Sequence, residues 1–169
     1  MNESTTLAYL AGMIDGDGYI SIARSTAKGK DYFAAQIGIA GTRREPHDLA
    51  ASLFGGSVYC YRPANPRHRP QFQWQRMGKA AVPVIEAILP YLLIKQDHAL
   101  LALELHECVT ECWSEDAFPW FGPDYDPIVA MRRMREEMID MNQSRNRLRV
   151  GKKAAGRLLD GKTWDQVPA

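Results

Sequence analysis

The stretch LAGMIDGDG, residues 10–18, places two carboxylates and three glycines at the end of an apolar run. The carboxylates belong to Asp15 and Asp17, and carboxylate oxygens are the ligands that Ca²⁺ and Mg²⁺ prefer in proteins. A calcium-binding EF-hand is excluded, because the loop positions that need an oxygen ligand, a glycine and a glutamate would be Tyr19, Ile20 and Thr26. The sequence therefore predicts an acidic turn of another kind, and leaves open what faces its carboxylates.

Basic residues gather in one part of a chain whose formal net charge is only +1. Residues 19–79 contain ten basic and three acidic residues, a net charge of +7, and the rest of the chain carries −6. Such an asymmetry is typical of a protein that binds a polyanion through one face. On charge alone, a merely solvated surface remains the alternative.

Apolar spacing predicts the elements that must position these residues. Residues 7–14 have the pattern of a helix, which Ser4 or Thr5 can cap and which the glycine-rich turn 15–18 ends. Alternating residues predict two strand pairs, at 19–25 with 32–40 and at 57–62 with 71–76, each joined by a basic loop. Further helices are predicted at 44–56, 78–92, 95–109 and 126–142. This segregation of strands and helices predicts an α+β fold.

Each predicted strand pair has one apolar face for helices and one polar face rich in Gln, Ser and Tyr. These polar side chains can hydrogen-bond base edges, and the Lys and Arg residues of the loops suit phosphates. A sheet placed in a major groove needs this combination. If the protein were a plain protein-interaction module, neither the polar face nor the charge asymmetry would have a functional explanation.

The motif resembles the signature of the LAGLIDADG homing endonucleases, from which it differs only at Met13 and Gly16. The resemblance covers most of the chain and implies an αββαββα core, with a saddle-shaped antiparallel sheet for DNA, helices packed on the other face and further C-terminal helices. It implies residues 1–150 as the endonuclease domain, followed by a basic tail or helix at 151–169. The implied activity is that of a metal-dependent DNA endonuclease carried by a mobile genetic element.

The resemblance also implies how the chain assembles. The sequence has one motif and no internal repeat, so the implied form is a homodimer bound to a long pseudo-palindromic double-stranded DNA site, with one cut in each strand. Gly12 and Gly16 lie on one helix face, where the partner's helix could approach closely. Together with Tyr9, these glycines are the expected dimer interface.

Three residues are expected at the reacting phosphate by the same resemblance. Asp17 and the carbonyl of Gly16 would bind Mg²⁺, for which Mn²⁺ could substitute, and Asp15 would brace the turn. The segment PYLLIK resembles the family segment that ends in an active-site lysine, here Lys95. Lys95 would stabilise charge on the phosphoryl group or polarise the attacking water.

The residues expected to contact DNA come from the polar sheet face, its loops and the basic tail. The tail segment MNQSRNRLRVGKK is similar to a family segment that contacts the DNA backbone. The expected DNA-binding residues are Ser21, Arg24, Ser25, Lys28, Lys30, Gln36, Arg43, Arg44, Tyr59, Tyr61, Arg62, Arg67, Arg69, Gln71, Gln73, Gln75, Ser144, Arg145 and Arg147.

One departure from the family pattern bears on cleavage. The family often has Gln or Asn after the second strand, to position water, where this chain has Gly41. Either Thr42, Arg43 or Arg44 substitutes, or the water network differs. The alternative function is therefore a non-cleaving DNA- or RNA-binding protein, such as a maturase or regulator, on the same fold.

Other classes are disfavoured by composition. The N-terminal residues MNESTT match neither a signal nor a transit peptide, and no run reaches the ~18 apolar residues of a membrane span. We therefore expect a cytoplasmic protein that uses neither a membrane nor a small-molecule substrate. Three cysteines, an odd number, argue against a disulfide framework. Cys108 and Cys112, near His98 and His106, are interpreted as packed helix residues rather than metal ligands.

Overall fold

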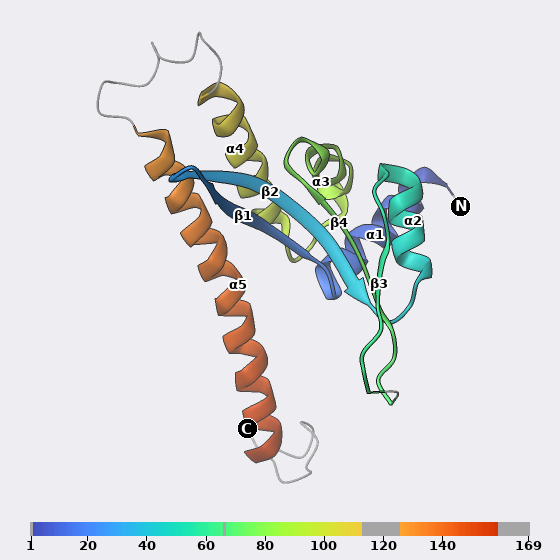
Figure 1. The fold of residues 1–169 in the computed structure, drawn as a ribbon. Helices are drawn as coiled ribbons and strands as arrows, with labels where there is room; N and C mark the ends of the chain where they lie inside the picture. Colours follow the sequence, from blue (N-terminus) through green and yellow to red (C-terminus); the bar gives the residue numbers. More distant parts are fainter. Residues whose placement is uncertain (1, 66, 113–125, 159–169) are drawn as a thin grey trace.

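A four-stranded antiparallel sheet with helices packed against one face forms the molecule (Figure 1). The computed structural model describes residues 2–65, 67–112 and 126–158. The elements in chain order are α1 (Glu3–Gly16), β1 (Tyr19–Ala27), β2 (Lys30–Gly41), α2 (Glu45–Phe54), β3 (Tyr59–Tyr61), β4 (Gln71–Met77), the short 3₁₀ helix η1 (Gly78–Ala80), α3 (Val82–Ile88), the 3₁₀ helix η2 (Leu89–Tyr91), α4 (Gln96–Cys112) and α5 (Pro127–Leu158). The predicted α+β fold is confirmed.

The strands lie in the order β1-β2-β4-β3, and every neighbouring pair is antiparallel. Each hairpin is thus one of the two predicted strand pairs, and β2 joins them through β4. Proline and glycine set the limits of the helix between them, because Pro46 lies in the first turn of α2 and Gly55, at φ 69°, ends it.

Several element boundaries differ from those expected. Helix α1 begins at Glu3 with Asn2 at the N-cap, so neither Ser4 nor Thr5 caps it. Helix α5 continues past residue 142, its expected end, into the segment 151–169 that was expected as a basic tail or helix. The basic tail sequence has no proline before residue 168 and is rich in Arg, Lys, Ala and Leu, which favour continued helix.

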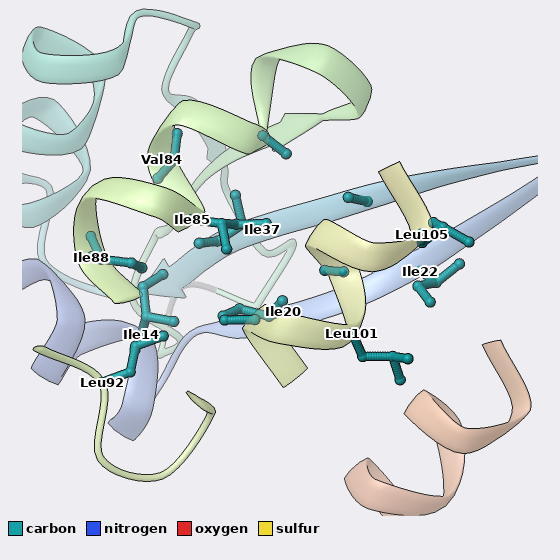
Figure 2. Close-up of a cluster of buried hydrophobic side chains, with 14 of the residues drawn as sticks. Ile14, Ile20, Ile22, Ile37, Val84, Ile85, Ile88, Leu92, Leu101 and Leu105 are labelled. Atoms are coloured by element: carbon teal, nitrogen blue, oxygen red, sulfur yellow. The ribbon is translucent and has the colours of Figure 1, made fainter. Parts of the chain in front are cut away.

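The core lies between the apolar face of the sheet and the helices α1, α3 and α4. Figure 2 shows Ile85 of α3 beside Ile37 of β2, and Leu105 of α4 beside Ile22 of β1. The largest buried side chain, Trp74 of β4, donates from Nε1 to the Gly55 carbonyl at 2.9 Å, which ties the end of α2 to the sheet. In the described part of the chain, no helix has the length and apolar character needed to cross a membrane.

A single carboxylate fastens α5 to the tip of the β1–β2 hairpin. Asp31 accepts hydrogen bonds from Arg24 of β1 at 3.0 Å and from Arg132 of α5 at 2.7 Å, and its side chain is only 5% exposed. Thr26 donates to the same carboxylate at 3.0 Å. Because three donors converge on it, Asp31 links two strands and the C-terminal helix.

Acid should weaken this attachment. Arg132 above all, then Arg24 and Thr26, hold the pKa of Asp31 below its ordinary value of 3.8. A carboxyl group with a lowered pKa in the folded state adds stability above its unfolded pKa, and that stability is lost as the pH falls through the folded pKa. We expect Asp31→Asn to lower the thermal midpoint at about pH 6, and the difference from the wild type to shrink towards about pH 3.

A matched control is Asp48→Asn, which removes the exposed ion pair between Asp48 and the N-cap residue Arg44 at the start of α2, whose side chains are 51% and 63% exposed. Asp48→Asn should change the free energy of unfolding by less than about 0.5 kcal/mol. A constant difference between the wild type and Asp31→Asn across the acid range would contradict the assigned role of Asp31.

Candidate functional site

Helix α1 ends in the turn that carries the second carboxylate of the motif. The N–H groups of Asp17 and Gly18 both donate to the Met13 carbonyl at 2.9 Å. Gly18 has no room for a side chain, because a Cβ there would lie 2.7 Å from the Ile14 Cα and 2.8 Å from the Gly38 carbonyl oxygen. The turn is therefore pressed against α1 and β2, which fixes the backbone of Asp17 where the chain enters β1 and leaves its side chain exposed.

The first carboxylate of the motif, Asp15, is buried, with 7% of its surface exposed. Its Oδ2 atom accepts from the N–H groups of Leu93 at 2.8 Å and Ile94 at 3.0 Å, and its Oδ1 atom from that of Lys95 at 2.9 Å. These N–H groups immediately precede α4, whose dipole favours a negative charge there. The brace expected of Asp15 thus acts on residues 93–95 rather than on its own turn.

The side chain of Lys95 in turn contacts the end of α1. It is 5% exposed, and its Nζ atom donates to the carbonyls of Ile14 and Asp15, the latter at 2.8 Å. These are among the last carbonyls of α1, where helix geometry leaves acceptors without partners and the dipole favours a cation. We refer to these reciprocal contacts as the Asp15–Lys95 clamp, which places the Lys95 ammonium against the turn that carries Asp17.

The oxygen atoms at this turn suit a hard divalent cation. No hydrogen bond or ion pair in the described part of the chain uses the Asp17 carboxylate, and the backbone of Gly16 lies beside it. Among the described residues, no group of three His, Cys, Asp or Glu side chains is arranged to hold a metal. One carboxylate and backbone carbonyls fit Mg²⁺ or Mn²⁺, since Mg²⁺ keeps several waters and binds through one or two carboxylates plus phosphate oxygens.

Gly41, at the expected water-positioning point, ends β2 opposite Phe72. A Cβ at Gly41 would lie 3.6 Å from Cε1 of His47, a residue of α2 that sequence reasoning did not single out. His47 is 1% exposed, and neither of its ring nitrogens has a hydrogen-bond partner among the described residues. Of the three expected substitutes, Arg44 is engaged by Asp48 at 3.1 Å.

Strand register places most of the expected base-contacting residues on one face of the sheet. Ser21 pairs with Gln36, Gln75 with Gly38, and both pairs lie opposite the apolar core face. The same alternation extends to β3, because Tyr59 pairs with Gln73 and Tyr61 with Gln71. We call this surface the polar sheet face; of the expected residues it includes Ser21, Ser25, Gln36, Tyr59, Tyr61, Gln71, Gln73 and Gln75.

Arg24 does not belong to this face. It is three positions from Ser21, so it points to the helix side of the sheet, where Asp31 binds its guanidinium. The expectation that Arg24 contacts bases from the polar sheet face is therefore wrong, and its visible role is to hold the hairpin tip.

Two exposed basic loops lie at opposite ends of the sheet (Figure 1). One is the tip of the β1–β2 hairpin, with Lys28 at φ 51° and Lys30, and the other joins β3 to β4, with Arg62, Arg67 and Arg69. Arg43 is exposed in the turn before α2. Ser144, Arg145 and Arg147 fall on α5, and their side chains lie outside the described part of the structure.

A hydrogen-bonded cluster at the centre of the polar sheet face was missed in the sequence. The Tyr19 hydroxyl donates to Oε1 of Gln75 at 2.9 Å, and Nε2 of Gln36 donates to the same oxygen at 3.1 Å. Tyr19 crosses β2 at Gly38, where a Cβ would lie 2.7 Å from the phenol oxygen. The alternating pattern predicted the strands, but only the register of three strands brings these residues together.

One face of α1 is open to solvent. Tyr9 is 46% exposed, and a Cβ built on Gly12 or Gly16 would meet nothing within 4 Å beyond the backbone of its own helix. The segment that Asp15 holds against the end of α1 exposes two large apolar side chains, Leu93 at 91% and Ile94 at 56%. The expected interface residues are therefore accessible, and Leu93 and Ile94 are further exposed apolar residues near the end of the same helix.

No protein-family model and no curated protein sequence matches this chain. Solved structures do match in fold. The homing endonuclease I-CvuI, in complex with the I-CreI target DNA and magnesium with the DNA not cleaved, is 15% identical, with a TM-score of 0.63 over 82% of this chain and 83% of that one. The chain has the LAGLIDADG homing endonuclease fold.

Two further structures with this fold differ in size. An archaeal intron-encoded homing endonuclease complexed with DNA is 11% identical, with a TM-score of 0.62 over 83% of this chain and 86% of that one. The LAGLIDADG homing endonuclease I-GzeII, in complex with its DNA target, is 14% identical, with a TM-score of 0.52 over 66% of this chain but only 39% of that one. This chain therefore aligns with most of each of the two smaller structures, but with less than half of the larger I-GzeII chain.

The two carboxylates of the motif should differ sharply in their effect on stability. Asp15→Asn replaces one accepting oxygen with an amide group that cannot accept from the backbone N–H groups of residues 93–95. Because buried donors without partners are costly, we expect a loss of roughly 3 kcal/mol in the free energy of unfolding. Asp17→Asn changes an exposed side chain and should cost less than about 0.5 kcal/mol.

Urea denaturation of the two variants beside the wild type measures this difference. Equal losses for Asp15→Asn and Asp17→Asn, or a negligible loss for Asp15→Asn, would contradict the clamp.

Proposed function

We propose that the protein is a site-specific homing endonuclease that binds a long pseudo-palindromic double-stranded DNA site as a homodimer and hydrolyses one phosphodiester in each strand with a divalent metal ion. The observation that supports it most directly is the position of Asp17. The clamp and Gly18 fix the turn that carries its exposed carboxylate at the point where the polar sheet face begins. An oxygen donor for a metal and a surface suited to DNA thus adjoin each other.

DNA would lie along the polar sheet face. The glutamines, serines and tyrosines of this face can donate to and accept from base edges, whereas the basic loops at its two ends suit phosphates. The solved I-CvuI and archaeal structures with this fold are endonucleases bound to DNA. In this arrangement, Lys28, Lys30, Arg62, Arg67 and Arg69 supply salt-dependent affinity, and the sheet side chains supply sequence discrimination.

The residues of the site would have different roles at the reacting phosphate. Asp17 and the Gly16 carbonyl would hold Mg²⁺ or Mn²⁺, and the metal ion would supply an activated water and charge stabilisation at the phosphate. Lys95 acts as a positioning residue, because its ammonium binds α1 carbonyls and so holds the turn in place. Its buried positive charge also favours the anionic phosphate close to the turn.

The homodimer is supported by the open face of α1. Gly12 and Gly16 leave room for a second helix to approach, and Leu93 and Ile94 offer apolar knobs beside that room. In a two-fold contact each knob can meet the glycine-lined face of the other subunit.

A second function, DNA or RNA binding without cleavage, is favoured by one observation. Gly41 brings no side chain to the position where the family often has a water-positioning Gln or Asn, and Arg44 is engaged by Asp48. A maturase or regulator would keep the polar sheet face and the basic loops but would have no need of the Asp17 carboxylate.

Incubation with a library of randomised palindromic DNA duplexes and Mg²⁺ should yield a cleaved subset. Asp17→Asn should abolish cleavage, by a factor of about 10³ or more, because it removes the charged metal ligand, while salt-sensitive binding of the enriched site persists. Sequencing of cleaved ends and gel-shift titration measure the two properties separately. Binding without cleavage by the wild type favours the second function, and no salt-sensitive binding contradicts both.

Gly12→Leu should dissociate the dimer without unfolding the subunit, because Gly12 is exposed and has room for a Cβ, whereas the larger side chain fills the space that the second helix needs. At a protein concentration at least tenfold above the dissociation constant of the wild-type dimer, sedimentation velocity should show the wild type as a dimer and the variant as a monomer. Glu107→Leu, at an exposed position of α4, is the matched control and should remain dimeric. A monomeric wild type would contradict the proposed assembly.

A further inference from the structure

The phenol of Tyr19 is built into the polar sheet face rather than left free on it. Tyr19 pairs with Gly38, and Gly38 pairs in turn with Gln75 on the far side of β2. Because Gly38 has no side chain, the Tyr19 ring can cross this strand, where a Cβ would lie 2.7 Å from its hydroxyl oxygen. Three adjacent strands are thereby joined across one row of the sheet.

The hydrogen bonds of this row converge on a single oxygen. Oε1 of Gln75 accepts from the Tyr19 hydroxyl at 2.9 Å, from Nε2 of Gln36 at 3.1 Å and from Nε2 of Gln73 at 3.4 Å. Gln36 is oriented in turn, because its own Oε1 accepts from Ser21 at 3.4 Å while its Nε2 also donates to Tyr19 at 3.3 Å. The amide of Gln75 therefore has its acceptor occupied, and no described residue binds its Nε2 group.

A free glutamine can present either its oxygen or its nitrogen to a base, and its usual bidentate partner, adenine, uses both. The fixed amide of Gln75 can offer only its two N–H donors. Guanine presents two acceptors, N7 and O6, in the major groove, whereas cytosine presents the N4 donor.

We infer that Gln75 is a specificity-determining residue, locked by Tyr19, Gln36 and Gln73 as a donor that selects guanine at one position of each half-site. This inference rests on the proposed function, since it requires DNA on the polar sheet face. Tyr19 lies two residues after Asp17, so the guanine belongs to the inner part of each half-site, close to the cut.

The lock is suited to persist in solution. Tyr19, Gln36 and Gln75 are all half-buried, so their mutual hydrogen bonds compete with little water. Gln71, on the same strand and face, is exposed and takes no part in the cluster.

The test is to select binding sites from a randomised duplex DNA library in EDTA, so that no cleavage occurs, and to compare base preferences between variants. The wild type should prefer guanine by about fivefold or more at one position of each half-site. Gln75→Glu keeps one oxygen as the acceptor for the cluster and turns a second oxygen outward. The preference at that same position should therefore invert from guanine to cytosine, again by about fivefold.

Tyr19→Phe keeps the ring over Gly38 but removes the hydroxyl, so the amide of Gln75 gains freedom to present its oxygen. The guanine preference should broaden to include adenine at that position, with other positions unchanged. Gln71→Glu is the matched control and should weaken binding without any inversion of the inner base.

An unchanged base profile in Gln75→Glu, or a wild-type preference for cytosine at the affected position, would overturn the inference while leaving DNA binding intact. Failure of the wild type to enrich any sequence would instead contradict the proposed function. Circular dichroism of each variant checks that a changed profile does not come from loss of the fold.

Discussion

The arrangement of the candidate site depends on the reciprocal contact between Asp15 and Lys95. The carboxylate of one residue holds the backbone of the other, and the ammonium of the second holds the backbone carbonyls of the first. Both groups are buried, so each contact is protected from water and from salt. The end of α1 and the beginning of α4 are thus held together although they are far apart in the sequence. The position of the exposed Asp17 therefore depends on Lys95, whose charged group is buried.

The alternation of side chains along the strands gives the sheet one face for the core and one face for the outside. One face contributes Ile20, Ile37 and Trp74 to the core, and the other contributes glutamine, serine and tyrosine to the outside. Because successive side chains of a strand point to opposite faces, the surface proposed for DNA is held rigid by the core directly beneath it. Arg24 shows how strict the alternation is, since a shift of three positions from Ser21 moves its charge to the helix side.

Local patterns in the sequence were sufficient for the elements and for the fold class. Apolar spacing predicted α1, the four strands and the helices that follow, and the motif predicted which turn carries the exposed carboxylate. The partners of Asp15 could not be predicted, because residues 93–95 lie some eighty residues away and contribute backbone N–H groups, which no residue type reveals. The cluster around Gln75 was hidden for a related reason: it depends on the register of β1, β2 and β4, and on Gly38 being a place where another side chain crosses. Arg24 was assigned from its charge, although strand alternation alone excluded it from the face of Ser21.

The short segment 93–95 faces two ways at once. Its backbone and Lys95 are bound inward to α1, while Leu93 and Ile94 project into solvent beside the glycine-lined face. The backbone that carries these outward side chains is therefore also the backbone that binds Asp15, two residues before Asp17. In the proposed dimer, contacts that Leu93 and Ile94 make with the second subunit would bear on the same segment that positions the acidic turn, so that pairing of the subunits and the geometry of the reactive centre would be linked.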